Sequence, residues 1–266
     1  MMRAAGVDVG STQTKAVVMD EECKVLGRSL IDTGANVLRA AERSYELALQ
    51  DGGLRSEEVA YIVGTGYGRY RVTFGHAQIS EISCHARGAK FVFPGTRTVL
   101  DIGGQDSKAI KVGGEGEVID FSMNDKCAAG TGRFLVMAAY YLDLPLEEIG
   151  ERSLRAQKPV AITTTCTVFV ESEIMSHLGR GRKAEDILKG MHQAIATRSI
   201  SLTSRVGIEE EVTFTGGVSK NVGMVRSLEE GLEIGLNVSP ESHFMGAIGA
   251  GIFALERASV GAGQAH

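Results

Sequence analysis

Two short segments of the chain repeat the same pattern of residues suited to binding phosphate. Residues 7–17 and 100–110 align without gaps and place Asp, Gly, Lys and Ala at equivalent positions. In each copy an apolar strand carries the Asp, a turn with Gly follows, and a second apolar strand begins at the Lys, which predicts a β-hairpin. Glycine lets backbone N–H groups approach phosphate oxygens, lysine adds positive charge, and a carboxylate can hold Mg²⁺.

The repeat predicts a nucleotide site with a metal ion. Asp8 and its counterpart Asp101 are the candidate Mg²⁺ ligands. The candidate phosphate ligands of the first copy, which offer a backbone N–H group, a hydroxyl or a positive charge, are Gly10, Ser11, Thr12, Thr14 and Lys15. The alternative is that each copy is only a tight hairpin with an Asp near its turn. Two matched copies favour the nucleotide site.

A third segment, residues 214–221, has the pattern expected around a nucleoside. A predicted strand ends in the pair Gly216 and Gly217, and a helix follows after Lys220. Free N–H groups at such a junction can bind a phosphate, and glycine lets a flat base lie against the backbone. A strand-to-helix turn also needs glycine for purely structural reasons. The chain contains neither the Gly-x-Gly-x-x-Gly nor the Gly-x-x-x-x-Gly-Lys motif.

Two of the four cysteines, Cys127 and Cys166, stand just before predicted helices. The positive end of a helix lowers the pKa of a thiol there, which suits a reactive thiolate or an anionic iron–sulfur cluster. A four-cysteine cluster would need two chains, since each offers only two such cysteines. The alternative is that both are buried small hydrophobic residues, and spacing alone favours it. We interpret Cys23 and Cys84 as structural.

The composition of the whole chain limits the remaining possibilities. Hydrophobic residues make up 43% and charged residues 23% of the 266 residues, which excludes a disordered chain or a coiled coil. The formal net charge of −5 argues against a nucleic-acid partner. No segment has the ~18 consecutive apolar residues of a membrane span. Without a signal-peptide pattern either, we expect a cytoplasmic protein with no membrane partner.

Helices and strands alternate along the chain, which predicts an α/β fold in two lobes. Besides the two hairpins, apolar periodicity predicts short strands at 61–63 and 212–215. The predicted helices are 36–51, 82–92, 131–142, 167–178, 184–206, 222–231 and 246–257. We expect residues 1–95 to form the first lobe, onto which the helix 246–257 packs back, and residues 96–257 the second. The Gly- and Ala-rich residues 258–266 are expected to be a disordered tail.

Together, six motifs resemble one family of ATPases. They are Gly6–Thr12, Gly64–Arg69, Leu100–Asp106, Asn124–Gly132, Thr165–Phe169 and Thr215–Val218. The chain is similar in these motifs to the ATP-dependent activators of 2-hydroxyacyl-CoA dehydratases and to the related ATPase subunits of benzoyl-CoA reductase. The resemblance runs from about Gly6 to Ala254, and the Asn-Asp-Lys-Cys-Ala-Ala-Gly-Thr-Gly block is its most specific part.

The resemblance implies a fold and a reaction. The fold would be two ribonuclease-H-like lobes of the actin-like ATPase type, with ATP or ADP and Mg²⁺ in the cleft. One [4Fe-4S] cluster would bridge a homodimer, held by Cys127 and Cys166 of each chain. Reduced ferredoxin or flavodoxin would supply one electron, and ATP hydrolysis would change the angle between the helices that begin at the cysteines. The electron would pass to an iron–sulfur partner, an acyl-CoA dehydratase or reductase.

The same resemblance suggests roles for further residues. Gln13, Gly103 and Gly104 join the phosphate ligands, and Gln105 or Asp106 could orient the attacking water. Gly216, Gly217 and Lys220 would contact the nucleoside. The main alternative function is a small-molecule kinase of the acetate and sugar kinase superfamily, for which the cysteines would be irrelevant.

Overall fold

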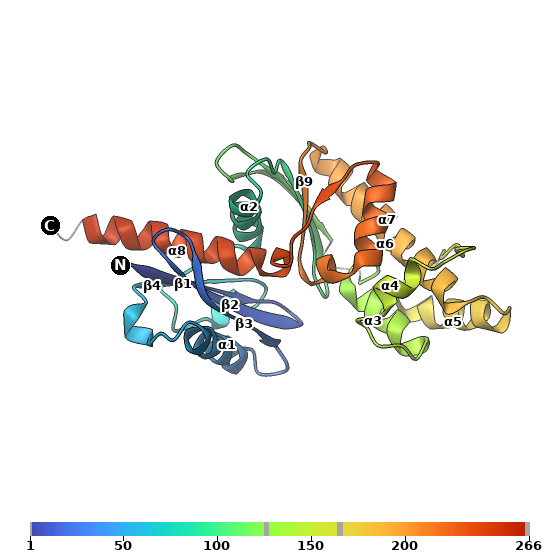
Figure 1. Cartoon of the computed structure of the whole chain (residues 1–266), viewed down its shortest axis with the longest axis horizontal. Coiled ribbons are helices and arrows are strands. Elements are labelled where there is room, and N and C mark those ends of the chain that lie inside the picture. Colours follow the sequence, from blue (N-terminus) through green and yellow to red (C-terminus); the bar gives the residue numbers. More distant parts are fainter. Residues whose placement is uncertain (1, 125–127, 164–166, 264–266) are drawn as a thin grey trace. The chain divides into compact units, whose positions relative to one another are not determined.

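The computed structural model describes residues 2–124, 128–163 and 167–263 and divides into two compact units. The first unit consists of the residues up to Gly95, of 112–118 and of the chain from Phe244 on. The second consists of 96–111 and 119–243. Figure 1 shows the elements of both units along the chain.

The first unit is built on a mixed five-stranded sheet with the order β3-β2-β1-β4-β5. Its strands are β1 (Arg3–Val9), β2 (Gln13–Asp20), β3 (Val25–Asp32), β4 (Tyr61–Thr65) and β5 (Ala77–Gln78). Strand β1 is antiparallel to β2 and parallel to β4. Its helices are α1 (Val37–Asp51), α2 (Glu81–Val92) and α8 (Met245–Gly263), with short 3₁₀ turns at Ser56–Glu58 and Arg69–Arg71.

Helices α1 and α8 cover opposite faces of this sheet (Figure 1). Side chains alternate along β1 and therefore pack in turn against one helix and the other. Ala5, Val7 and Val9 are buried in one cluster with residues of α1. Ala4 packs in another cluster with residues of α8. Gly6 faces the same way, and a Cβ there would lie 2.1 Å from the carbonyl oxygen of Ala247 in α8. The helix therefore rests directly on the strand backbone.

Helices α2 and α8 approach each other just as closely. A Cβ on Gly88 would lie 2.2 Å from the carbonyl oxygen of Met245, and one on Gly249 would lie 1.9 Å from that of Cys84. Real Cβ atoms do not come so near to backbone oxygens, so both positions need glycine for this crossing. Part of the high glycine content of the chain serves this helix packing.

The second unit repeats the same sheet, with the order β10-β9-β6-β7-β8. Strand β6 is antiparallel to β7 and parallel to β9, as β1 is to β2 and β4. The strands are β6 (Thr98–Ile102), β7 (Ser107–Val112), β8 (Val118–Asn124), β9 (Val212–Thr215) and β10 (Leu236–Asn237). The helices are α3 (Gly132–Tyr141), α4 (Ile149–Ser153), α5 (Thr167–Gly179), α6 (Ala184–Val206) and α7 (Val222–Leu232), with 3₁₀ turns at Gly217–Lys220 and Ser242–Phe244.

The core of the second unit lies between one face of its sheet and these helices. Leu100, Ile102 and Phe214 from β6 and β9 are fully buried there, together with Phe134 of α3 and Met191 of α6. Because side chains alternate along a strand, Asp101 between Leu100 and Ile102 points to the opposite face.

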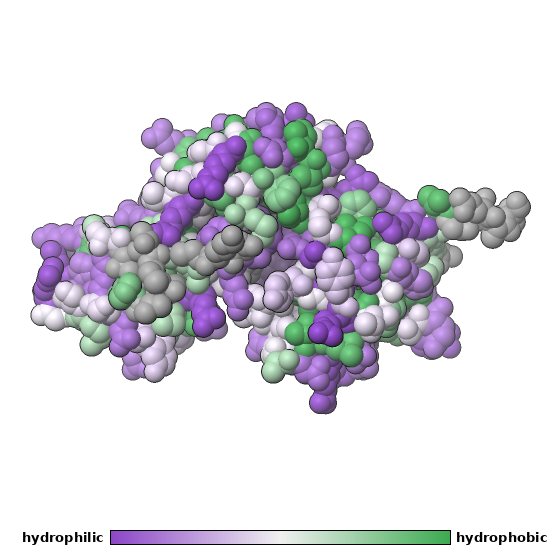
Figure 2. Space-filling view, turned by 180° about the vertical axis from the view of Figure 1, so that it is seen from behind, coloured by the Kyte–Doolittle hydropathy of each residue, from purple (hydrophilic) through white to green (hydrophobic). Residues whose placement is uncertain are grey.

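Most predicted elements agree with the structure within a few residues. The structure has α6 and β9 at the predicted bounds, whereas α8 continues past Arg257 to Gly263, within the segment expected to be disordered. The sequence did not predict the strands β3, β5, β8 and β10 or the helix α4. Within the described part of the chain, no helix is both long and apolar enough to cross a lipid bilayer. On the face in Figure 2, hydrophobic residues form separate patches among hydrophilic ones.

Replacing Gly249 by Ala should destabilise the first unit. The added methyl group would meet the carbonyl oxygen of Cys84, so α8 and α2 must separate, at a cost of about 1–3 kcal/mol of unfolding free energy or more. Gly114→Ala is the matched control, because nothing lies within 4 Å of its added methyl group. Chemical denaturation measures both variants, and equal unfolding free energies would contradict the close crossing.

Candidate functional site

The first unit holds a buried carboxylate at the end of its central strand. Asp8 is 5% exposed and stands opposite Lys15 on β2 and Thr65 on β4. After Thr65 the chain turns at Gly66 with a φ of +87°, and a Cβ there would lie 2.5 Å from Asp8 Oδ1. A Cβ on Gly246 would lie 2.8 Å from Asp8 Oδ2. Glycine at these two positions thus lets the backbone pack closely against both carboxylate oxygens.

The second unit has the same frame at the end of its own central strand. Asp101 is 3% exposed and stands opposite Lys108 on β7 and Thr215 on β9. Gly216 has a φ of +86°, and a Cβ on it would lie 2.5 Å from Asp101 Oδ1. The internal repeat therefore includes the third strand and the glycine after it, and not only the hairpin.

The two hairpin turns close in the same way. The N–H of Gly10 donates to the carbonyl oxygen of Gln13 (3.1 Å), and that of Gly103 to the carbonyl oxygen of Asp106 (2.9 Å). Gln13 and Asp106 occupy equivalent positions in the repeat, yet one is neutral and the other acidic. This difference changes the electrostatics of the two turns.

The lysines of the repeat have different partners. In the second unit Lys108 Nζ lies 3.3 Å from Asp101 Oδ2 and 2.9 Å from Asp106 Oδ2. In the first unit Lys15 is 8% exposed, and its Nζ donates a long bond of 3.5 Å to the carbonyl oxygen of Gln13. Lys15 forms no ion pair among the described residues. The first turn therefore keeps a positive charge for an anionic ligand.

The other predicted ligands differ in how available they are. Ser11, Thr12 and Gln13 are partly or fully exposed along the first turn. Thr14 is fully buried, and its hydroxyl lies 2.9 Å from that of Thr33, which donates to the carbonyl oxygen of Gly10 (2.8 Å). Side chains alternate along β2, so Thr14 points to the face covered by α1 and Lys15 points to the other face. From that face Thr14 supports the turn through its contact with Thr33.

The second turn and the segment after β9 contain the remaining predicted residues. Gln105 is exposed, whereas Asp106 is half-buried and paired with Lys108. Gly216 ends β9, and the 3₁₀ turn that follows ends at the exposed Lys220. Both lie in the same unit as Asp101, and Gly216 contacts its carboxylate directly.

The cysteines divide into two groups. Cys127 and Cys166 lie outside the described residues. Cys84 is fully buried, and burial raises the pKa of its thiol to about 12. Burial and the carboxylate of Asp20 also raise the pKa of Cys23. Neither environment favours the thiolate that binds a metal.

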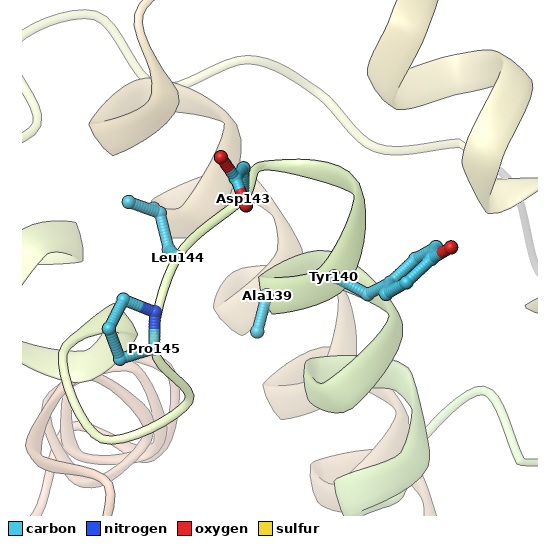
Figure 3. A pocket seen from close by; sticks show the side chains of 5 residues that line it. All are labelled: Ala139, Tyr140, Asp143, Leu144 and Pro145. Carbon is cyan, nitrogen blue, oxygen red and sulfur yellow. The ribbon is translucent and has the colours of Figure 1, made fainter.

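A surface pocket of about 470 Å³ lies elsewhere in the second unit, at the C-terminal end of α3. Its lining is Ala139, Tyr140, Asp143, Leu144 and Pro145, and the ring of Tyr140 points away from the other side chains (Figure 3). Within this unit, the second hairpin turn contacts the opposite, N-terminal end of α3 through the N–H groups of Gly132 and Arg133.

Sequence reasoning did not assign a role to Lys108, Thr65, Thr215 or Gly246. The recurrence of Lys in the repeat was a signal for Lys108. For the two threonines the signal was the Thr-Gly pair that follows a short apolar strand at 65–66 and again at 215–216. The repeat was harder to see there, because β4 and β9 follow their hairpins after segments of very different length.

Comparison with known proteins gives sequence matches over nearly the whole chain. The model of the BadF/BadG/BcrA/BcrD ATPase family matches residues 5–254. The activator of lactoyl-CoA dehydratase from Anaerotignum propionicum is 42% identical over 257 residues, covering 97% of this chain and 99% of that protein. A benzoyl-CoA reductase subunit from Thauera aromatica is 32% identical over 268 residues, covering 97% of this chain and 94% of that protein.

Solved structures confirm the predicted α/β fold of the actin-like ATPase type. Component A of (R)-2-hydroxyglutaryl-CoA dehydratase from Acidaminococcus fermentans has a TM-score of 0.94 at 41% identity, covering 97% of this chain and 100% of that one. The activator of 2-hydroxyisocaproyl-CoA dehydratase from Clostridium difficile, with bound ADPNP, has a TM-score of 0.94 at 40% sequence identity. The match covers 99% of this chain and 98% of that one. A ROK family glucokinase from Streptomyces griseus has 0.61 at 13% identity over 96% of this chain and 99% of its own, which shows the fold alone.

Lys108→Met should destabilise the protein far more than Lys15→Met. Loss of one member of a buried ion pair costs about 3–5 kcal/mol, because the remaining charge stays buried. Lys15 has no acidic partner among the described residues, so we expect its replacement to change the unfolding free energy by less than about 1 kcal/mol. Denaturant titration measures the unfolding free energy of both variants. Equal destabilisation would contradict the difference in ion pairing between the two lysines.

Proposed function

Because the chain belongs to the BadF/BadG/BcrA/BcrD ATPase family, we propose that it is an ATP-driven electron donor for an iron–sulfur acyl-CoA dehydratase or reductase. The resemblance found in its sequence motifs is thereby confirmed, and the chain is an ATPase of the family that activates 2-hydroxyacyl-CoA dehydratases. Its full-length similarity to several such activators carries the proposal. The kinase alternative has only the shared fold in its favour.

The first turn is the proposed phosphate-binding element. Lys15 supplies a buried positive charge, and the turn from Gly10 to Gln13 supplies N–H groups and hydroxyls. Thr14 supports this turn from behind through Thr33. The Lys15 ammonium, which forms no ion pair with any described residue, fits an anionic ligand, because a buried charge without a counter-charge is otherwise unfavourable.

Asp8 and Asp101 are the proposed Mg²⁺ ligands. Their carboxylate oxygens are ligands of the kind that Mg²⁺ prefers, and the two stand at equivalent places in the repeat. Mg²⁺ would offset the charge that develops on the transferred phosphoryl group. Gln105, exposed on its turn, and Asp106, held by Lys108, are the candidates for orienting the attacking water. We propose that Gly103 and Gly104 contact phosphate, and that Gly216, Gly217 and Lys220 contact the nucleoside.

Cys127 and Cys166 are the proposed ligands of a [4Fe-4S] cluster shared by two chains. The raised thiol pKa values of Cys23 and Cys84 support this choice, because cluster ligands are thiolates. The cluster would carry one electron at low potential. In each cycle, reduced ferredoxin or flavodoxin would lose one electron and the partner enzyme would gain it. Hydrolysis of ATP by water to ADP and phosphate would drive the transfer through different dimer geometries in the two nucleotide states.

Asp8→Asn and Asp101→Asn should each lower ATP hydrolysis by about 100-fold or more, because the metal-assisted charge stabilisation is lost. The iron content should stay the same in both variants. Asp32→Asn, at the exposed end of β3, is the control and should keep full activity. Steady-state ATPase assays under anoxic conditions measure the effect. Normal hydrolysis in both variants would overturn the assignment of the metal ligands.

Cys127→Ser and Cys166→Ser should each remove the iron, the brown colour and electron delivery. The unchanged protein should hold ~4 iron atoms per dimer, since four thiolates serve one cluster. ATP binding should remain, because the proposed nucleotide ligands are other residues. Cys23→Ser and Cys84→Ala are the controls and should keep their iron. Iron analysis after anoxic purification tests this, and a cluster that survives in either of the first two variants refutes it.

A further inference from the structure

Different contacts hold the buried carboxylates of the two units. In the second unit Lys108 Nζ lies 3.3 Å from Asp101 Oδ2, and the hydroxyl of Thr215 donates to Asp101 Oδ1 (3.3 Å). In the first unit Asp8 is 5% exposed, yet its carboxylate makes no hydrogen bond or ion pair with the residues that the structure describes. A buried carboxylate without such partners is unfavourable, so a further group must compensate it.

The residues of the first unit that correspond to this lysine and threonine have other neighbours. Lys15 Nζ donates to the carbonyl oxygen of Gln13 (3.5 Å). Thr65 is fully buried, and its hydroxyl lies beside the thiol of Cys84 in α2. Because neither group is bonded to Asp8, the two corresponding positions do not explain how this carboxylate is held. The thiol contact shows, however, that α2 reaches this end of the sheet.

The next residue of α2, His85, faces Asp8. A Cβ on Gly246, at the start of α8, would lie 2.8 Å from Asp8 Oδ2 and 2.9 Å from His85 Nε2. Two atoms that both lie this near to one point are close enough for a single water molecule to bridge them. A carboxylate only accepts hydrogen bonds, whereas an imidazole N–H donates, so the two groups are complementary. The His85 side chain is buried as well, which excludes most of the solvent from this contact.

The crossing of α2 and α8 fixes the place of this histidine. A Cβ on Gly88 would lie 2.2 Å from the carbonyl oxygen of Met245, and one on Gly249 would lie 1.9 Å from a carbonyl oxygen of α2. Gly88 follows His85 by three positions, and Gly249 follows Gly246 by three, so each glycine lies on the same side of its helix as that residue. The backbone contacts therefore hold His85 against Gly246, where it faces the carboxylate.

We propose that His85 is a positioning residue for the Mg²⁺ site at Asp8. Its Nε2–H group holds the Asp8 carboxylate, through one water molecule, in a fixed orientation toward the metal ion. An N–H donor of this kind orients a carboxylate and, unlike the ammonium group of Lys108 at Asp101, leaves its negative charge for the cation. The proposal rests on the proposed function, because it takes Asp8 as a ligand of Mg²⁺.

Three replacements of His85 test the role of this donor. The amide nitrogen in His85→Gln can take the place of Nε2 and donates a hydrogen bond, whereas the shorter amide in His85→Asn cannot reach that place and His85→Leu has no donor. The Mg²⁺ concentration for half-maximal ATP hydrolysis should rise by about 10-fold or more in His85→Leu and His85→Asn, because hydrogen-bond partners of metal ligands have effects of this size. In His85→Gln it should stay within about 3-fold of the unchanged protein. The rate at saturating Mg²⁺ should fall less than this concentration rises.

A second readout needs no turnover. Calorimetric titration with ADPNP over a series of Mg²⁺ concentrations measures how much of the metal ion is needed to tighten nucleotide binding. The three variants should rank in the same order as in the ATPase assay. With EDTA in place of Mg²⁺, all of them should bind ADPNP as the unchanged protein does, because His85 acts through the metal site.

His76→Leu is the matched structural control from the same unit. His76 Nδ1 accepts from the N–H of Ile62 (3.0 Å), and its ring stacks on Tyr61. Its loss should lower the unfolding temperature, because these contacts hold the start of β4. The Mg²⁺ requirement should stay the same, so a general loss of stability can be told from the loss of a positioning residue.

The Mg²⁺ requirements also distinguish this proposal from the proposed function. If His85→Leu and His85→Asn need no more Mg²⁺ than the unchanged protein, the positioning role is refuted and the function stands. If His85→Gln is as impaired as His85→Leu, the role of the Nε2 donor is refuted. If ADPNP binding and ATP hydrolysis by the unchanged protein do not depend on Mg²⁺, the proposed metal site fails first. Thermal unfolding checks that each variant is folded, and His85→Asn with His85→Gln decides the matter where His85→Leu does not fold.

Discussion

Both units depend on burying a carboxylate at the end of a central strand. The side chains of Asp8 and Asp101 are almost completely buried. A buried charge is unfavourable unless its surroundings compensate it. Lys108 pairs with Asp101, whereas Lys15 forms no ion pair with Asp8, yet equivalent residues surround both carboxylates. A Lys stands opposite on the antiparallel strand, a Thr on the parallel strand, and a left-handed Gly after that Thr lies against the oxygens.

Within this common frame, one substitution separates the two turns. Asp106 stands where the first hairpin has Gln13, and it shares Lys108 with Asp101. The two carboxylates of the second turn therefore exceed its single lysine by one negative charge, while Lys15 in the first turn forms no ion pair with a described residue. A duplicated element has in this way acquired two properties, a cationic turn suited to phosphate and an acidic turn suited to a metal ion and water.

Glycine connects these turns to the rest of the structure. Gly246 brings the start of α8 against Asp8, and Gly132 brings the start of α3 against the second turn. A Cβ on Gly246 would lie 2.8 Å from Asp8 Oδ2, and one on Gly132 would lie 3.1 Å from Cγ2 of Val218 and 3.2 Å from the carbonyl oxygen of Gly103. The packing that forms the fold therefore also places these two helix starts against Asp8 and against the second hairpin turn.

The sequence by itself determined the elements and the repeated hairpin, because apolar periodicity and turn residues act over a few neighbouring positions. It also indicated the family, and it made Asp8, Asp101 and Lys15 candidates for a nucleotide site. Only the tertiary structure decided which of these groups are held in hydrogen bonds and ion pairs within the protein. Pairing of β6 with β9 brings Thr215 to Asp101 across 114 positions, and the ion pairs leave Lys15 and not Lys108 available. Alternation along β2 turns Thr14 inward. Such roles depend on distances between segments remote in the chain, which no local pattern encodes.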